Sequence, residues 1–473
     1  MKRTFLVFGL VVAAMGWTFG ASAGQEEDAT PVTRLTVHPA AAPRPALKYK
    51  LLPGFFEKRP GNAAVVYNRL WAENYQLYKY YAENGPEIAS WADMPLEKLP
   101  REKVKNFVAM TGGVYRDFVW GSRLESCDWE QPFREGNPFA VLLPEIQQIR
   151  TPARFFAIRA RWQIAQGRFD EAIETLRTGY ALGRNVAESP CLVADLVGMA
   201  ICGIMSHQIE TMIEQPGCPN LYWALTDLPS PIIDTRGAFE AEYDMFYLAF
   251  PELRKIDETN HGPEYWRNLV ERMADQLTWL NNPRRIPKDE RAVFAGLVLK
   301  GYPKARRALI AQGRTADEVD AMPVAQVVMI YTVETFEELR DEQFKWLYLP
   351  WWQAAPGMKE ANRSLREESQ RREIIPVAGM LLPAIQAVKF AEARNERTIA
   401  LLRTIEALRL HAASHDGRLP ERLTDIAEVP IPIDPLTGRP IECKIADGVA
   451  TLEVFDSPRS KKPDRLIEIR MAK

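Results

Sequence analysis

A long apolar stretch of the chain lies at 189–214 and reads SPCLVADLVGMAICGIMSHQIETMIE. Between Leu192 and Met205, Asp195 is the only charged residue. A helix that is apolar nearly all round must be surrounded either by lipid or by other helices. The apolar run is shorter than the roughly 20 residues that a hydrocarbon layer requires. The pattern therefore predicts a central buried helix.

The residues around this stretch predict how the helix begins and packs. Ser189 is a suitable N-cap, and Pro190 would then occupy the first helical position, where its missing N–H costs nothing. Gly198 and Gly203 lack side chains. We expect both glycines to let neighbouring helices approach closely.

Helical periodicity recurs along most of the chain. It predicts helices over 62–84, 96–110, 237–250, 265–280, 289–312, 322–349 and 384–415, and a short helix with a turn over 221–234. Residues 112–138 contain Asp, Glu, Pro and Gly without periodicity and predict a long irregular connection. The expected inner face of 322–349 comprises Val324, Val327, Val328, Tyr331 and Leu339. Its acidic residues Glu334, Glu337, Glu338 and Asp341 offer paired carboxylates, but a solvated face is favoured.

A helical hairpin is predicted over 151–185, where two helical segments flank Gly167. The run GRFDEAI at 167–173 resembles one tetratricopeptide-type hairpin. Arg159 and Gln163 stand where that repeat usually has apolar or aromatic residues, and Gly179 replaces its usual alanine. Such repeats need about three copies to bury a continuous core, and no second copy is evident. The resemblance therefore implies an antiparallel helix pair without a known peptide groove.

The end of the chain changes to a strand pattern. Asp447-Gly448 separates two alternating segments, 440–445 and 449–455, which is a strong hairpin signal. Residues 465–471 alternate as a third strand. We predict an antiparallel meander over 440–471 that buries one side against the preceding helix, with Ile441, Cys443 and Ile445 facing Val449, Thr451 or Leu452.

This tail also carries a family resemblance. A long helix followed by GRLPERLTDI and IDPLTGRPIECKIADGVATLEVF, within 399–457, resembles the end of type II secretion pseudopilins and of exported bacterial helical proteins with a similar tail. Pseudopilins carry their hydrophobic helix at the N-terminus, whereas here the similar helix ends a long soluble region. The resemblance therefore implies neither filament assembly nor a calcium site, since Asp434 is matched only as part of an Asp-Pro turn.

Together these patterns predict a mostly α fold. An irregular antiparallel helical bundle or solenoid-like array is expected over 51–415, followed by a small β-containing region over 416–473. Sequence proportions agree with a globular protein, because 47% of the 473 residues are hydrophobic and 26% are charged.

The N-terminus predicts export. Lys2 and Arg3 precede an apolar segment at 5–19, and Ala-Ser-Ala at 21–23 supplies the small residues that signal peptidase needs. We expect cleavage after Ala23 and a periplasmic or extracellular protein; an uncleaved membrane anchor is the alternative. Residues 24–50 are rich in Ala, Pro, Thr and Glu and predict a flexible tether. No transmembrane span is expected in the mature chain.

The charge distribution argues against two classes of binding partner, and the cysteine spacing excludes one disulfide pairing. The 60 basic and 62 acidic residues contain no long run of one sign, which argues against nucleic acid or anionic membrane as a partner. Cys191 and Cys202 cannot bridge each other, because eleven helical residues rise about 16 Å and a disulfide needs Cα atoms within about 7 Å. Cys202 is expected to be a small core residue. Cys127 and Cys218 lie in predicted loops. The sequence neither requires nor excludes a disulfide between them.

Catalytic motifs are absent from the sequence: no phosphate loop, C-x-x-C, H-E-x-x-H or G-x-S-x-G occurs. No cofactor is predicted. His411 and His415 share one helical face and offer a metal two imidazoles. Their alternative role is to cap the negative end of the helix dipole, which is favoured. Asp416 is either a third ligand or the start of a turn.

The run FKWLYLPWW holds a second candidate site. Trp351 and Trp352 follow Pro350 and offer rigid apolar area to a partner, a sugar or a membrane interface, although packing under the next segment is favoured. The leading hypothesis is an exported helical scaffold or protein-interaction protein. The alternative is an extracytoplasmic hydrolase of glycan or peptide polymers, using carboxylates that the sequence does not identify.

Overall fold

A computed structural model of the chain describes residues 30–257, 261–281, 287–371, 382, 384–457, 460 and 462–472. The predicted signal peptide and its cleavage site lie outside these residues. The chain forms two compact units. Among the described residues, the first unit combines Gln131–Leu142 with Arg236–Lys389, and the second combines 30–130 with Leu143–Thr235 and the residues from Phe390 onward. The helical region expected over 51–415 contributes residues to both units.

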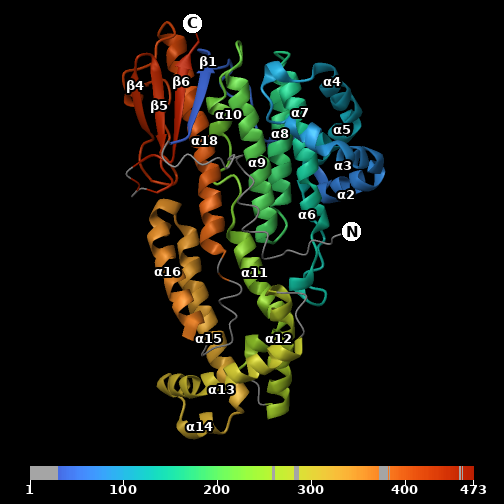
Figure 1. Cartoon of the computed structure of the whole chain (residues 1–473), viewed down its shortest axis with the longest axis vertical. Coiled ribbons are helices and arrows are strands. Elements are labelled where there is room, and N and C mark those ends of the chain that lie inside the picture. The colour runs from blue at the N-terminus through green and yellow to red at the C-terminus, as the bar shows by residue number, and fades with distance from the viewer. Residues whose placement is uncertain are drawn as a thin grey trace. The chain divides into compact units, whose positions relative to one another are not determined.

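Three long helices form the centre of the second unit (Figure 1): α7 (Arg150–Ile164), α8 (Phe169–Val186) and α9 (Leu192–Ile213). The predicted hairpin is confirmed in α7 and α8, which turn at Gly167 with a φ of +68°. Helix α9 is the predicted central helix, with Val197, Ile201 and Met205 fully buried. Its N-cap is Cys191 and not Ser189, because the backbone is still extended at Cys191.

The two central glycines differ in their surroundings. A Cβ on Gly198 would lie 2.5 Å from the carbonyl oxygen of Gly183 in α8. Gly198 therefore permits the predicted close approach. A Cβ on Gly203 would meet nothing within 4 Å. The prediction for Gly203 is wrong, because that face of α9 has no close neighbour.

The length and composition of helix α9 are also those of a membrane-spanning helix. Of the helices in the described part of the chain, α9 alone is long and apolar enough to cross a membrane by length and composition. The whole helix therefore meets a length and composition that its shorter apolar run does not. In the structure, 67% of its most apolar window is buried inside the protein.

Shorter elements complete the helical part of this unit: η1 (Phe55–Glu57), β2 (Arg59–Asn62), α2 (Ala63–Glu73), α3 (Tyr75–Ser90), η2 (Leu96–Lys98), α4 (Arg101–Met110), α5 (Gly112–Gly121), β3 (Leu124–Ser126), α6 (Pro144–Gln148) and α10 (Tyr222–Thr226). The helix predicted over 62–84 is two helices interrupted at Asn74. The irregular connection predicted over 112–138 instead begins with α5. This helix buries Phe118, which stacks on Tyr67 of α2, so packing outweighs the weak helix propensity of its three glycines.

The C-terminal sheet confirms the predicted meander. Strands β4 (Glu442–Ala446), β5 (Val449–Val454) and β6 (Arg465–Met471) pair antiparallel, with the tight turn at Asp447-Gly448. Cys443 lies opposite Leu452 as expected, whereas Ile445 lies opposite Ala450. Alternate residues of β5, namely Ala450, Leu452 and Val454, are buried.

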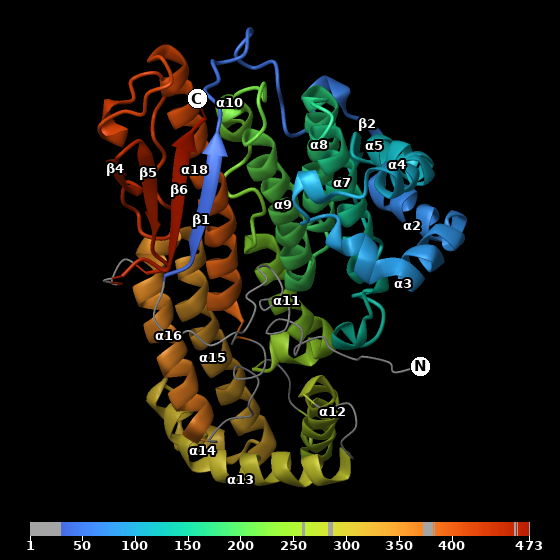
Figure 2. The same cartoon turned by 45° about the horizontal axis from the view of Figure 1, so that its top comes forward.

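A fourth strand joins this sheet from the other end of the chain. Strand β1 (Val32–Val37) pairs parallel with β6, as Figure 2 shows. The tether predicted over 24–50 is therefore wrong for these residues. Leu35 and Val37 are buried, so this short strand gains its stability from a distant partner that local periodicity does not reveal.

Helix α18 (Ile385–Ser414) precedes the sheet, and η6 (Leu423–Asp425) lies between them. The boundary between the units falls inside α18, after Lys389. Arg397 of α18 contacts the carbonyl of Phe455 at 2.9 Å and the carboxylate of Asp456 at 2.6 Å. These bonds attach the end of β5 to the helix.

The described residues of the first unit form helices joined by turns and irregular segments, without a strand. It contains η3 (Pro138–Ala140), α11 (Arg236–Ala249), η4 (Pro251–Lys255), α12 (Pro263–Asn281), α13 (Pro287–Ala311), α14 (Ala316–Asp320), α15 (Val324–Phe344), η5 (Lys345–Tyr348) and α16 (Trp351–Arg371). The helices expected over 237–250, 265–280, 289–312 and 322–349 are present. Val324 is 40% exposed, contrary to the predicted inner face, while Val327 and Val328 are fully buried. The two units together confirm a mostly α fold with a small C-terminal antiparallel sheet.

Candidate functional site

The tryptophan pair is split by the start of α16. Trp351 begins the helix and is 8% exposed, as the packing hypothesis expects, whereas Trp352 is 36% exposed. A Cβ on Gly357 would lie 2.1 Å from the ring of Trp346. The indole of Trp346 therefore lies directly on the backbone of α16. Trp346 and Trp351 are therefore packing residues. Of the predicted pair Trp351 and Trp352, it is Trp352 that is exposed.

A surface hollow of about 630 Å³ lies beside this aromatic run, within the first unit. It is lined from α11, α15 and η5 by Glu240, Tyr243, Asp244, Arg340, Asp341, Glu342, Phe344, Lys345 and Tyr348. Four of these residues are acidic, three are aromatic and two are basic. Ligand sites of small molecules occupy a similar volume, about 300–1,000 Å³.

The basic residues of the hollow are already engaged. The Arg340 guanidinium lies 3.9 Å from the centre of the Tyr243 ring and 2.6 Å from the carboxylate of Asp341. The Lys345 ammonium lies 2.6 Å from Glu342. Glu240 is exposed and accepts a hydrogen bond from the hydroxyl of Tyr348 at 3.3 Å, and the ring of Tyr348 is 61% exposed. An open carboxylate and an open aromatic ring therefore lie side by side.

The acidic face of α15 is solvated in part: Glu338 and Asp341 are exposed, as predicted, whereas Glu334 and Glu337 are half-buried. Glu337 accepts hydrogen bonds from Tyr243 at 3.3 Å and from Tyr247 at 2.5 Å. Burial, together with the hydrogen bond to Glu337, raises the pKa of Tyr247. Burial also raises the pKa of Glu334. Asp341 lies at the hollow. Helical spacing placed these acids on one face, but their partners differ. Glu337 is contacted from α11, Glu334 accepts a hydrogen bond from Gln312 at 3.1 Å, and Asp341 pairs with Arg340 of α15 itself.

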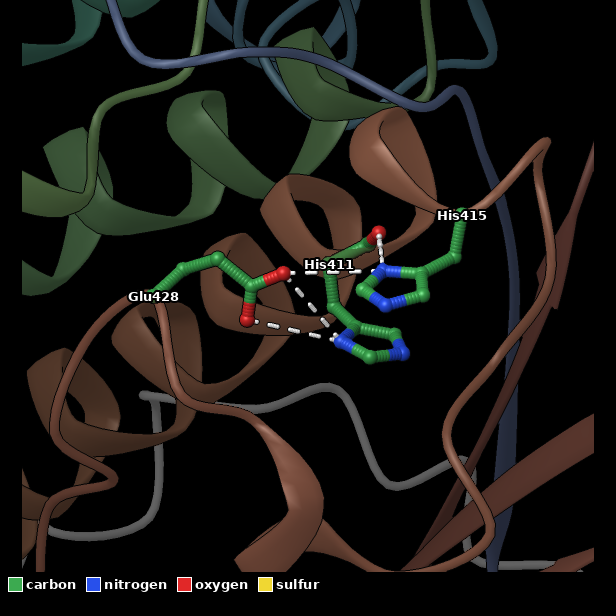
Figure 3. A group of neighbouring side chains, drawn as sticks. All are labelled: His411, His415 and Glu428. Carbon is green, nitrogen blue, oxygen red and sulfur yellow. Dashed lines mark hydrogen bonds and ion pairs between the residues drawn. The ribbon is translucent and has the colours of Figure 1, made fainter.

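Figure 3 shows the second candidate, the predicted histidine pair at the end of α18. The rings of His411 and His415 stack with their centres 3.8 Å apart. Glu428, from the segment after η6, joins them, and one ligand atom from each of the three residues lies within 4.8 Å of the other two. His411 is buried, whereas the side chain of His415 is 52% exposed.

Hydrogen bonds within this group support the capping role. Nδ1 of His415 lies 2.9 Å from the carbonyl oxygen of His411, one of the helix-end carbonyls that has no intrahelical donor. The hydroxyl of Ser414 donates to Glu428 at 2.7 Å. Burial opposes ionisation of Glu428, but the hydrogen bonds from Ser414 and His411 outweigh it and lower the pKa of that carboxyl. The group is thus organised around an ionised Glu428.

Sequence reasoning identified His411 and His415 but not Glu428. Asp416 was the sequence candidate for a third ligand; it has a φ of +52° and begins the turn that ends the helix. Glu428 is placed by its buried neighbours Ile426 and Val429. No helical or strand period connects it to the histidines, so the sequence carries no signal for the contact.

The cysteines offer no disulfide or reactive site. All five are free, including Cys127 and Cys218, so the pairing left open for these two does not form. Cys202 is fully buried in α9, as expected for a small core residue. Burial raises the pKa of the Cys202 thiol to about 12, which keeps it protonated and unreactive.

Comparison of the chain with protein-family models, with curated proteins and with solved structures found no match. The geometry of the two candidate sites is therefore the basis for the functional argument.

Proposed function

We propose that this chain is an exported helical interaction protein, and that its hollow between α11 and α15 binds a basic segment of a partner protein. The observation that carries the proposal is the pairing of Arg340 with the Tyr243 ring and the Asp341 carboxylate inside the hollow. A ring face and a carboxylate together form a favourable site for a guanidinium or ammonium group.

The open part of the hollow repeats this chemistry. Glu240 and Tyr348 provide a carboxylate and an exposed ring next to each other. A lysine or arginine of a partner would find here the same two contacts that Arg340 finds within the chain. The acidic residues lining the hollow outnumber the basic ones by four to two, which favours a cationic occupant.

The test measures binding of fluorescent peptides to the full chain. A lysine- and arginine-containing peptide should bind, and an acidic peptide of equal length should not. Glu240→Gln and Tyr348→Ala should each weaken binding by about tenfold, equivalent to about 1.4 kcal/mol. The matched control is Glu360→Gln, an exposed acid of α16 that pairs with Arg363 and does not line the hollow.

If the Glu240→Gln and Glu360→Gln variants bind the basic peptide equally well, the peptide contacts another surface and the hollow is not its binding site. Cleavage of the peptide during the assay would instead favour the hydrolase hypothesis. Export is tested separately by N-terminal sequencing of protein recovered outside the cytoplasm. A mature chain should begin at Gly24, and a start at Met1 would contradict the signal-peptide prediction.

A further inference from the structure

We propose that His411, His415 and Glu428 form a binding site for a divalent transition-metal ion, with zinc as the best fit. Unlike the hollow, this site lies entirely in the second unit. The proposal is independent of the proposed function, since no residue is shared between the two.

Nδ1 of His411 makes a long hydrogen bond of 3.4 Å with Oε2 of Glu428, and the distances to Oε1 also fit coordination of an ion. Nδ1 of His411 lies 3.4 Å from Oε1 of Glu428, and Nδ1 of His415 lies 3.6 Å from the same oxygen. A good charge-assisted N–H···O bond is shorter, about 2.7–2.9 Å. Zinc bonds of about 2.0–2.1 Å with tetrahedral geometry place neighbouring ligand atoms about 3.3–3.4 Å apart. The two histidine–glutamate distances are thus close to this spacing, and the ligand atoms of all three residues lie within 4.8 Å of one another.

The donor set selects the class of metal. Two imidazole nitrogens and one carboxylate oxygen suit zinc, copper or nickel. Calcium and magnesium favour sites made of oxygen ligands. The side chain of His415 is half exposed, so a fourth position is open to water. This N₂O set is the same in type as catalytic zinc sites, but the base that such hydrolases require is not part of the group.

Binding requires a change at His415, whose ring must rotate out of its stack on His411, because the planes are only 15° apart and an imidazole binds a metal in its own plane. In the structure Nδ1 of His415 faces the carbonyl oxygen of His411 at 2.9 Å, which fits an Nδ1–H donor. A metal at Nδ1 replaces that proton, which moves to Nε2 of the same neutral ring. The capping bond and metal binding therefore compete, and binding also weakens at low pH because a metal ligand must be unprotonated.

Rigid neighbours hold the third ligand in place. Ser414 donates to Oε1 of Glu428 at 2.7 Å, and buried Ile426 and Val429 fix the backbone on either side of the glutamate. Hydrogen bonds of this kind orient metal ligands and are worth about 10–100-fold in affinity. An ion here would join the end of α18 to the segment that leads into the sheet.

Calorimetric titration of the full, EDTA-treated and desalted chain with ZnCl₂ tests the site. The wild-type chain should bind one more zinc ion than the His415→Ala and Glu428→Gln variants. Ser414→Ala should retain the site with affinity reduced by roughly tenfold or more. Zinc should raise the melting temperature of the wild-type chain and not that of His415→Ala. The substitution is made at His415 and not at His411, because His415 is exposed, whereas His411 is buried and also contributes to packing.

His207→Ala is the matched control. His207 lies 3.3 Å from Glu210 and 3.8 Å from Asp93, so it is the strongest competing histidine–carboxylate group in the described residues. Loss of the ion in His207→Ala but not in His415→Ala would overturn the proposal. Equal zinc binding by the wild-type, His415→Ala and Glu428→Gln chains would do the same. Calcium or magnesium binding as tightly as zinc at these residues would refute the assigned metal class.

Discussion

At the scale of single residues, the fully buried ion pair between Glu406 and Arg409 is the most demanding feature of the second unit. Neither side chain is exposed to solvent. Arg409 contacts both carboxylate oxygens of Glu406, at 2.8 and 2.9 Å, and donates to the carbonyls of His38 and Cys218, each at 2.8 Å. Burying two charges is tolerable only when their hydrogen-bonding groups are satisfied. This arginine therefore fastens two distant backbone segments to α18.

Replacing this arginine tests its contribution. Arg409→Ala leaves the Glu406 carboxylate buried without its cation, and the free energy of unfolding should fall by about 3–5 kcal/mol. Arg422→Ala is the control, because Arg422 and Asp425 form an ion pair of the same i,i+3 spacing on the surface. Chemical denaturation should show a lower midpoint for the first variant and little change for the second. Equal midpoints would mean that the buried pair is dispensable.

At the scale of elements, the contact between α8 and α9 is set by glycines. Gly183 and Gly198 face each other, and a Cβ on either would lie less than 3 Å from the other's carbonyl oxygen. Gly179 is similar, because a Cβ there would lie 2.1 Å from the sulfur of Met205. A methionine side chain is able to move, whereas a backbone carbonyl moves only with its helix. The Gly183–Gly198 contact is thus the constraint on how closely the two helices pack.

Two glycine-to-alanine variants of α9 separate packing from helix propensity. Gly198→Ala should force the helices apart and destabilise the protein by about 1–3 kcal/mol, the usual cost of overpacking. Gly203→Ala, five residues further along the same helix, adds its methyl group to open space. It should instead stabilise the helix by up to about 1 kcal/mol. The denaturation midpoints should move in opposite directions, and a shift in the same direction would contradict the assigned close approach.

At the scale of the whole chain, the sheet of the second unit brings together residues from both ends of the sequence. Every residue of β1 is paired in register with β6, from Val32 with Leu466 to Val37 with Met471. The sheet is also tied to α9, because Arg465 lies 3.5 Å from Glu210 and the amide of Thr36 donates to Glu214 at 3.3 Å. The C-terminal meander is therefore not an independent module.

This arrangement predicts that a change near the N-terminus weakens the C-terminal strand. Val37→Asp places a charge at a fully buried position and should lower the denaturation midpoint and the hydrogen-exchange protection of 465–471. Val32→Asp makes the same chemical change on the same strand at a position that is 37% exposed, and it should leave that protection nearly intact. Unchanged protection of β6 in Val37→Asp would contradict the pairing.

Features carried by local chemistry were predictable from the sequence. Helix α9 is apolar nearly all round, which predicted that it is buried. Helical periodicity predicted α11, α12 and α15, and Asp447-Gly448 predicted the hairpin turn. In each case the signal lies in neighbouring residues: side-chain spacing sets which face is buried, and a tight turn requires residues that accept a positive φ. The histidine pair was visible for the same reason, since i and i+4 share a helical face.

Tertiary structure decided the features whose partners lie far apart in the sequence. Strand β1 reads as a proline-rich tether because its pairing partner follows more than 400 residues later. Helix α16 is not among the helices predicted from the sequence, because its apolar positions are few and it packs against α15 and η5. Glu428 and the hollow have no sequence signature, since their geometry depends on where separate elements meet. Local patterns determine which faces must be buried, but only packing determines what buries them and which polar groups converge.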